Sequence, residues 1–447
     1  MRVFDASTYT QYGDSNNIFV PSAFGSAPIV LSDGGVIAAD AKRVGYRPPG
    51  NNTTWITTRK KTTDTTPVND DGTPVSPVLV GSKIVFIAEK CPIGSSPTTA
   101  PDCGISTYKV VQSGTTVTSL DLKAFKRLKV GSNYYETLNT PTVDLVHNRV
   151  YIAASIICPA CGLNQDRDAK IFSADIDPAS GGISNLTAIY SFTGPGGASP
   201  VLVVGEQIGG VTGNGIYFDG QTHYVPPATP DCSASVATAS DYAGCFYKIF
   251  DTTAGTTPTV IASAVWVHSY RGSTFQAGGA LDPRGGLWVY PFFQAGSGDP
   301  PTCVYGALDH GNCLIRLDQT TGNVVSGSET DLTMLINGFT TTPTQRKYAF
   351  MPSSALTLTR NLSTSSYYLT MGAMKASAGN YGTVPSVVTV NVTSTPALYS
   401  TTQTTVIGAD TPSLPSPANG QFPVVTIGTH QKTVFTGQSF GPYFFGN

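Results

Sequence analysis

The chain has 447 residues and a net charge of −2 at pH 7, and only 12% of its residues are charged. That charged fraction is about half the ~25% of an average soluble domain. With 47 Gly and 32 Pro, and with Thr and Ser throughout, the composition favours strands and turns over helices. The basic clusters, Arg59–Lys61 and Lys123–Lys129, are short and are interpreted as solvated strand edges, so no nucleic-acid partner is expected. No apolar run approaches the ~18 residues that span a bilayer, so no membrane span is expected either.

A hairpin pattern, two short apolar runs joined by a turn, recurs along the chain. Clear copies are SAPIVLSDGGVIAAD from Ser26, VSPVLVGSKIVFIAE from Val75, NTPTVDLVHNRVYIAAS from Asn139 and ASPVLVVGEQIGGVTGNGIYFDG from Ala198. Looser copies are FQAGGALDPRGGLWVYP from Phe275, MPSSALTLTRNLSTSSYYLTMG from Met351 and FPVVTIGTHQKTVFTG from Phe422. The pattern therefore predicts seven structural repeats.

A second, weaker hairpin follows most copies of the first. Three of these second hairpins contain a turn of the form Asp-x-x-x-Gly, at Asp177–Gly181, Asp251–Gly255 and Asp318–Gly322. An Asp side chain can accept hydrogen bonds from backbone amides two residues further on, and Gly tolerates a positive φ. These units are therefore predicted to be tight turns between strands.

Two hairpins per repeat give four strands per repeat. Four-stranded sheets arranged radially are the β-propeller architecture, in which each sheet packs against its neighbours. We therefore predict an all-β fold in which residues 1–447 form a single seven-bladed propeller, closed as a ring by N- and C-terminal strands. The segment Asn17–Pro21 is a candidate for the closing strand. A tandem of β-sandwiches or a β-helix is the alternative, although a β-helix would have a shorter and stricter period.

The eight cysteines form four pairs that are close in sequence: Cys91/Cys103, Cys158/Cys161, Cys232/Cys245 and Cys303/Cys313. An even number of locally paired cysteines predicts disulfides, which persist outside the reducing cytosol. A zinc site is the alternative at Cys158/Cys161 only, because no second Cys-x-x-Cys or paired His follows at the required distance. Sequons at Asn51, Asn52, Asn185, Asn361 and Asn391 are compatible with an exported glycoprotein. We predict an extracellular or cell-surface protein; no signal peptide is recognisable, so the exported form would be a mature chain.

Strand alternation also predicts which loops lie at the same end of a sheet. If four strands run alternately up and down, the connection between the second and third strands lies opposite the turns of the two hairpins. All eight cysteines are predicted to fall in these central connections, in the second to fifth repeats. One end of the sheets should therefore carry long loops stapled by disulfides, and loops on a rigid scaffold are where binding sites usually develop.

Three of the five histidines fall near this stapled end. His223 and His310 lie in the long loops, and His268 precedes Tyr270 and Arg271 in a connection to the next repeat. His, Tyr and Arg side chains can perform acid–base chemistry on a carbohydrate, with Arg binding a carboxylate through two hydrogen bonds. His223, His268, Tyr270, Arg271 and His310 are therefore the candidate catalytic residues. The alternative is that they are unrelated loop residues. His147 and His430 lie in hairpin turns at the opposite end and are expected to be plain surface residues.

Oxygen-rich segments could hold a structural calcium ion. Candidate ligands are Asp70, Asp71, Asp166, Asp168 and Asp309, all in turn-like segments. None follows the EF-hand pattern, so ordinary Asp-capped turns are the alternative.

The repeat resembles known propeller families. VSPVLVGSKIVFIA from Val75, with CFYKIFDTTAG from Cys245, resembles the quinoprotein-type (PQQ-like) repeat, and LDPRGGLWVYP from Leu281 resembles the streptogramin-lyase repeat. The resemblance covers nearly the whole chain and implies the propeller fold. The regular Trp-bearing motif of quinoproteins is absent, since the only Trp residues are 55, 266 and 288. The resemblance therefore makes a quinone-dependent dehydrogenase only a third hypothesis, which uptake of the quinone cofactor by the protein would test.

The absence of a catalytic motif, the low charge and the loop asymmetry favour a binding or assembly module. We predict that its stapled-loop end binds a protein or a glycan. The alternative function is a secreted carbohydrate-active enzyme of the polysaccharide lyase type, with a His/Tyr/Arg site at the same end.

Overall fold

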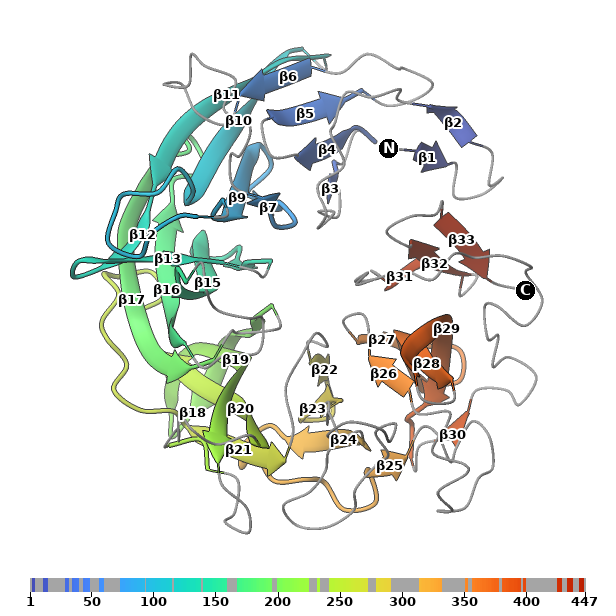
Figure 1. The fold of residues 1–447 in the computed structure, drawn as a ribbon. Coiled ribbons are helices and arrows are strands. Elements are labelled where there is room, and N and C mark those ends of the chain that lie inside the picture. Colours follow the sequence, from blue (N-terminus) through green and yellow to red (C-terminus); the bar gives the residue numbers. More distant parts are fainter. Residues whose placement is uncertain are drawn as a thin grey trace. The chain divides into compact units, whose positions relative to one another are not determined.

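The structure is a computed structural model. It describes residues 2–4, 11–14, 29–31, 34–39, 43–48, 56–59, 73–92, 94–114, 116–137, 140–158, 167–194, 199–224, 231–233, 241–271, 279–290, 313–331, 350–352, 356–377, 380–394, 397–398, 424–427, 432–436 and 442–445. In these residues every regular element is a β-strand, and every pairing whose register is described is antiparallel (Figure 1). The all-β prediction is therefore confirmed. Nowhere in this part of the chain is there a helix with the length and hydrophobicity needed to cross a membrane.

The chain divides into two compact units. One contains Met1–Ile216 and Ile249–Ala264, and the other contains Tyr217–Lys248 and Val265–Asn447. The division passes through one sheet, named sheet 4 below. This division into compact units does not test whether residues 1–447 form a single domain, which stays a prediction.

The first unit begins with a hairpin and three sheets. The hairpin is β1 (Arg2–Phe4) and β2 (Gln11–Asp14). Sheet 1 contains β3 (Ile29–Val30), β4 (Val36–Ala39), β5 (Arg43–Arg47) and β6 (Ile56–Arg59). Sheet 2 contains β7 (Thr73–Pro74), β8 (Val78–Val80), β9 (Ile84–Lys90), β10 (Ile105–Ser113) and β11 (Thr116–Lys126). Sheet 3 contains β12 (Leu128–Val130), β13 (Asn133–Glu136), β14 (Thr142–Asp144), β15 (Arg149–Ile156), β16 (Asp168–Ile176) and β17 (Ile183–Thr193).

Sheets 4 to 7 are formed by the strands that follow along the chain. Sheet 4 contains β18 (Val201–Ile208), β19 (Val211–Tyr224), β20 (Asp241–Asp251) and β21 (Trp266–Arg271). Sheet 5 contains β22 (Ala280–Asp282), β23 (Gly286–Val289), β24 (Cys313–Asp318) and β25 (Thr330–Asp331). Sheet 6 contains β26 (Phe350–Pro352), β27 (Thr357–Arg360), β28 (Tyr367–Ser377), β29 (Asn380–Asn391) and β30 (Ala397–Leu398). Sheet 7 contains β31 (Val424–Ile427), β32 (Lys432–Thr436) and β33 (Pro442–Phe445).

Each predicted hairpin is present as a pair of neighbouring strands. The pairs are β3–β4, β8–β9, β14–β15, β18–β19, β22–β23, β27–β28 and β31–β32. The short β12–β13 hairpin was not predicted, because its apolar positions are too few to form a pattern. The predicted closing segment Asn17–Pro21 lies outside the described residues.

The Asp-x-x-x-Gly segments form the predicted tight turns. In the first and third, the Gly N–H donates to the Asp carbonyl oxygen at 2.8 Å, in Asp177–Gly181 and in Asp318–Gly322. In all three, the Asp carboxylate accepts from the amide two residues on, at 2.8–3.0 Å. The three Gly residues have φ of +82°, +88° and +74°, which a side chain would disfavour.

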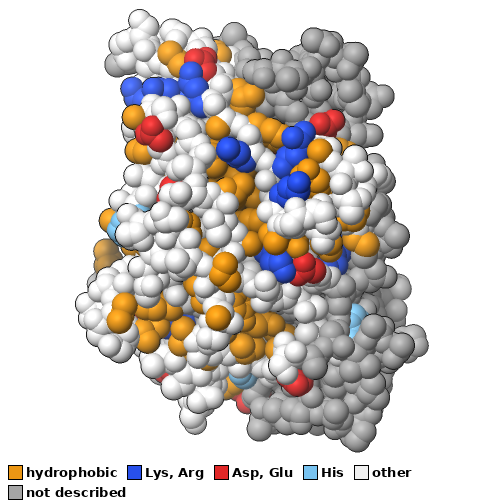
Figure 2. Space-filling view, turned by 90° about the vertical axis from the view of Figure 1, so that its left-hand side faces the viewer, with side chains coloured by type: hydrophobic (Ala, Val, Ile, Leu, Met, Phe, Trp, Pro, Cys, Tyr) orange, Lys and Arg blue, Asp and Glu red, His pale blue; other side chains and the backbone are white. Residues whose placement is uncertain are grey.

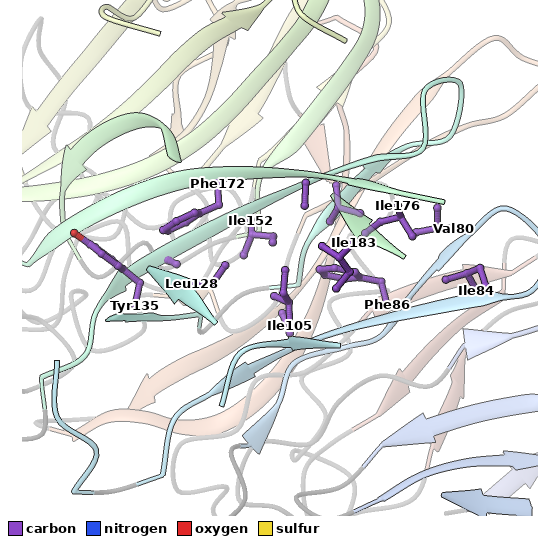
Figure 3. Close-up of a cluster of buried hydrophobic side chains, with 14 residues drawn as sticks. Val80, Ile84, Phe86, Ile105, Leu128, Tyr135, Ile152, Phe172, Ile176 and Ile183 are labelled. Carbon is purple, nitrogen blue, oxygen red and sulfur yellow. The ribbon is translucent and has the colours of Figure 1, made fainter. Parts of the chain in front are cut away.

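Sheet 2 buries both of its faces, because alternate residues of a strand point in opposite directions. Ile84 and Phe86 of β9 belong to a cluster with side chains of sheet 3, which is drawn in Figure 3. Val85 and Ile87, the intervening residues, belong to a cluster with side chains of sheet 1. Consecutive sheets of the first unit therefore pack face to face.

The second unit has a cluster of the same kind. Trp288 and Leu314 of sheet 5 pack with Leu369 and Val390 of sheet 6, and all four side chains are buried. Here too, the apolar face of one sheet covers that of the next sheet along the chain.

Candidate functional site

Three of the predicted catalytic residues lie on β19 and β21 of sheet 4, two strands that are separated by β20. His223 lies near the end of β19, and His268 and Tyr270 lie on β21. In the register of β20 and β21, His268 pairs with Phe246 and Tyr270 pairs with Gly244. The rings of Tyr270 and Phe246 stack with centroids 5.3 Å apart, and the rings of Tyr270 and His268 lie 6.5 Å apart.

Gly244 allows the ring of Tyr270 to lie directly on the neighbouring strand. A Cβ atom at Gly244 would lie 2.2 Å from Cζ of Tyr270 and 2.4 Å from its hydroxyl oxygen. Any larger residue at this position would therefore have to displace the ring. Glycines opposite aromatic side chains in paired strands are used in this way.

Tyr270 is completely buried, and its hydroxyl has no hydrogen-bond partner within the described part of the chain. Burial raises the pKa of the Tyr270 phenol well above its ordinary value, and the negative charge of Asp219 raises the pKa further. The phenol is therefore neutral near pH 7 and can donate a proton in a hydrogen bond, but it is not a base there.

The remaining predicted catalytic and metal-binding residues are only partly described. Arg271 ends β21 and pairs with Ala243 through the backbone. Among the metal candidates, Asp168 is described, and its carboxylate accepts from the Tyr135 hydroxyl at 2.5 Å and from the ammonium of Lys170. The other residues lie outside the described part of the chain: His310, Asp70, Asp71, Asp166 and Asp309.

Metal ligands do not gather elsewhere in the described residues. Within them, no group of three or more His, Cys, Asp and Glu side chains is arranged to hold a metal ion. The predicted calcium site stays a prediction.

Two of the predicted disulfides are present, Cys91–Cys103 and Cys232–Cys245. Cys158 and Cys313 are also disulfide-bonded, and their predicted partners Cys161 and Cys303 lie outside the described residues. Each described cysteine lies in the connection after the second strand of a predicted hairpin (β9, β15, β19 or β23) or in the first half of the strand that follows. In the part that the structure describes, the stapled loops therefore lie where the sequence predicts them.

The Cys91–Cys103 loop is fixed to sheet 3 at several points. The amide of Cys91 donates to the Glu136 carboxylate at 3.0 Å, and the guanidinium of Arg167 lies 3.4 Å from the other carboxylate oxygen. The amide of Tyr134 donates to the Pro97 carbonyl at 2.7 Å. Burial raises the pKa of Glu136 despite these donors. The loop is therefore held from outside as well as closed by its disulfide.

The Cys232–Cys245 loop is also held against its sheet. The hydroxyl of Thr222 donates to the Asp231 carbonyl at 2.9 Å, and the hydroxyl of Ser269 lies 3.0 Å from the Cys232 sulfur. Asp231 accepts from the backbone amide and the hydroxyl of Ser233, and these two hydrogen bonds lower the pKa of Asp231. Residues 231–233 thus have a defined position beside β19 and β21.

The opposite end of sheet 3, in the first unit, carries a buried ionic network that the sequence did not suggest. The Arg149 side chain is fully buried and donates to Asp175 at 2.7 Å and to Asp251 at 3.2 Å. Tyr151 donates to the same oxygen of Asp251 at 2.7 Å and accepts from Asn214 at 3.0 Å. Burial raises the pKa of Tyr151 above its ordinary value, and the charge of Asp251 adds to this effect. These groups satisfy one another, so their role is structural.

His147 belongs to the edge of this network and is more than the plain surface residue that we expected. Its Nδ1 lies 2.6 Å from a carboxylate oxygen of Asp144, whose side chain is fully buried. Burial alone would raise the pKa of Asp144, but hydrogen bonds from Asn214 and His147 outweigh it and lower the pKa. The Asp-x-x-His spacing within a turn is the signal that could have revealed this contact.

Comparisons with known proteins give only weak likenesses. No protein-family model and no curated protein matches the chain. Among solved structures, a chain from a complex of an S. cerevisiae Dbp5 variant with Nup159, a Gle1 variant, IP6 and ADP is 8% identical over 95% of this chain and 89% of that chain, with a TM-score of 0.35. A glucose dehydrogenase is 11% identical over 77% of this chain and 93% of that chain, with a TM-score of 0.31. The weak structural neighbours thus include a glucose dehydrogenase, but neighbours at this level of similarity assign neither a family nor a function to the chain.

Proposed function

We propose that the chain is an extracellular seven-bladed β-propeller whose disulfide-stapled loops bind a protein or a glycan. Each of the sheets 1 to 7 would be one blade, and strands from the two ends of the chain would close the ring. The face-to-face packing of consecutive sheets within each unit supports this architecture, because each blade of a propeller must bury both faces. The disulfides fit an extracellular protein.

The observation that carries the binding function is the anchoring of the stapled loops. The Cys91–Cys103 and Cys232–Cys245 loops are each held by their own disulfide and by hydrogen bonds to neighbouring strands, as at Cys91 and at Asp231. A loop that is already ordered loses little conformational entropy on binding, which favours affinity. By contrast, the Asp177–Gly181 and Asp318–Gly322 turns at the other end of their sheets are short and capped by their own Asp side chains.

A ligand screen tests this proposal. The purified, oxidised protein would be heated with neutral and acidic glycans and with candidate protein partners, since a ligand that binds only the folded state raises the melting temperature. We expect a shift with at least one ligand, and we expect the shift to disappear when the loop disulfides are replaced by Ser pairs in a still-folded variant. A ligand that binds equally well to the disulfide-free variant would contradict the proposal.

A lyase-type enzyme is the second candidate, and the gathering of His223, His268 and Tyr270 on sheet 4 is the observation that favours it. The complete burial of Tyr270 counts against it, because a catalytic residue must touch the substrate. Cleavage of an acidic polysaccharide, followed as the appearance of unsaturated products, tests this candidate. Activity that survives in both His268→Ala and His310→Ala would exclude these residues from catalysis.

A further inference from the structure

The segment that leads from sheet 2 into sheet 3 is the most basic stretch of the described chain. Residues 123–129 contain four cations, Lys123, Lys126, Arg127 and Lys129, in a protein with only 12% charged residues. Lys126 ends β11, and Lys129 lies in the β12–β13 hairpin. Figure 2 shows several Lys and Arg side chains, some with Asp or Glu beside them, on the face that carries β11 and β12 in Figure 1.

This segment lies directly beside the Cys91–Cys103 loop. The Arg127 guanidinium donates to the Pro101 carbonyl at 2.5 Å, and the Tyr134 amide donates to the Pro97 carbonyl. Lys129 and Tyr134 are paired across the β12–β13 hairpin. The loop and the hairpin therefore form one continuous surface at the stapled end of the first unit.

Aromatic rings hold two of the cations in place. The Lys129 ammonium lies 5.0 Å from the centroid of the Tyr134 ring, and the Arg127 guanidinium lies 5.3 Å from that of Phe125. Cation–π contacts of this kind position a charge without neutralising it. Both rings are partly exposed, so they also offer apolar faces to a ligand.

Little negative charge opposes these cations. Lys126 and Lys129 are exposed and form no ion pair with any other described residue, whereas Lys123 is paired with Asp121 at 3.2 Å. Asp102 lies 3.9 Å from Arg127, the limit of an ion pair, and is itself exposed. The surface thus keeps a net positive charge that is available to a partner.

The loop adds hydroxyl groups to the same surface. Ser96 and Thr98 lie within hydrogen-bond distance of each other at 3.2 Å, and Thr98 is exposed. We define the basic hairpin surface as Lys126, Arg127, Lys129, Tyr134, Ser96 and Thr98.

We propose that the basic hairpin surface binds an acidic polysaccharide. Fixed cations would pair with the carboxylate or sulfate groups of the polymer, the exposed face of Tyr134 would pack on a sugar ring, and the hydroxyls would bond to sugar hydroxyls. A polysaccharide fits better than a nucleic acid, since the disulfides fit an extracellular protein and the whole chain is slightly acidic. This inference rests on the proposed function, because it names a ligand class and a binding surface at the stapled end.

The test measures binding of polygalacturonate oligomers, with fully methyl-esterified oligomers of the same length as the uncharged control. We expect binding of the acidic form only, weakening with salt as exposed ion pairs are screened. Lys126→Glu with Lys129→Glu should lower the affinity at least about tenfold, since two attractions become two repulsions. Lys83→Glu is the control for charge reversal at an exposed lysine, because Lys83 is exposed in the turn at the other end of sheet 2 and its substitution should leave binding unchanged.

Two further variants separate the ring from the charge. Tyr134→Leu removes the aromatic face and should weaken binding severalfold, whereas Tyr134→Phe should bind like the unmodified protein. Circular dichroism and the melting temperature would establish that each variant is folded.

Three results would overturn the inference. The first is no binding of the acidic oligomers, and the second is equally tight binding of polyglutamate, which would indicate a surface for acidic protein segments. The third is binding that survives Lys126→Glu with Lys129→Glu. If this remaining binding maps to another stapled loop, only the basic hairpin surface is wrong, whereas mapping to the hairpin turns at the other end would contradict the proposed function as well.

Discussion

Gly244 and Tyr270 should be energetically coupled, because each residue occupies the space that the other would need. Gly244→Ala places a methyl group 2.2–2.5 Å from three side-chain atoms of Tyr270, two of the ring and the hydroxyl oxygen, where contact distances are normally about 3.5 Å. Both residues are buried, so the strain cannot be relieved into solvent. Overpacking of this kind destabilises by ~1–3 kcal/mol, and Tyr270→Ala should destabilise by ~3–5 kcal/mol through the cavity that it leaves.

The double variant reveals the coupling. In the Tyr270→Ala background the clash is gone and the new methyl fills part of the cavity, so adding Gly244→Ala should have almost no effect on the free energy of unfolding. The double variant should therefore be about 2 kcal/mol more stable than the sum of the single effects predicts. Equilibrium urea unfolding of the oxidised protein, followed by Trp fluorescence, measures all four species.

Tyr270→Phe is the control, because it keeps the ring and removes only a hydroxyl with no hydrogen-bond partner in the described residues. It should change stability by less than about 1 kcal/mol, and Gly244→Ala should be as harmful in this background as in the unmodified protein. Effects of Gly244→Ala and Tyr270→Ala that add to within about 0.5 kcal/mol would refute this packing.

Other predictions concern buried charges and staples. Arg149→Met should destabilise by ~3–5 kcal/mol in thermal or urea unfolding, because Asp251 would keep a buried charge without its cation; a loss below about 1 kcal/mol would show that the pair is not buried in solution. Burial alone would raise the pKa of Asp282, but hydrogen bonds and charges from Arg284 and Arg316 outweigh it and lower the pKa. The ionised Asp282 carboxylate therefore stabilises the fold near neutral pH, and this stabilisation is lost as the pH falls through the folded-state pKa. Asp282→Asn should therefore flatten the acid side of the plot of stability against pH, and an unchanged acid side would contradict this assignment. Replacing Cys91 and Cys103 together by Ser should lower the free energy of unfolding by ~3 kcal/mol, as expected for a loop of this length, and equal urea midpoints would argue against the staple.

Local signals explain why much of the fold could be predicted. The hairpins are encoded by apolar runs and turns within about twenty residues, and the Asp-x-x-x-Gly turns depend on hydrogen bonds within five residues. The Cys91–Cys103 and Cys232–Cys245 disulfides join residues that are close in sequence. Each of these features could be identified without knowing how the sheets stack.

Features that depend on stacking could not be predicted in the same way. The ionic network joins Asp144 and Arg149 to Asn214, 70 residues from Asp144, and to Asp251, 102 residues from Arg149. Arg149 becomes buried and reaches Asp251 only when β15 of sheet 3 packs beside the end of β20. The burial of Tyr270 over Gly244 likewise depends on the register of β20 and β21, which no sequence pattern specified.

Mapping the ligand contact on the protein tests the account most directly. Hydrogen exchange of the oxidised protein would be compared with and without the tightest-binding glycan, and resolved to peptides by mass spectrometry. Binding at the stapled end would slow exchange in the stapled loops, at residues 94–103 and 231–233, and leave the Asp177–Gly181 and Asp318–Gly322 turns unchanged. Protection of those turns, with unchanged exchange in the stapled loops, would contradict it.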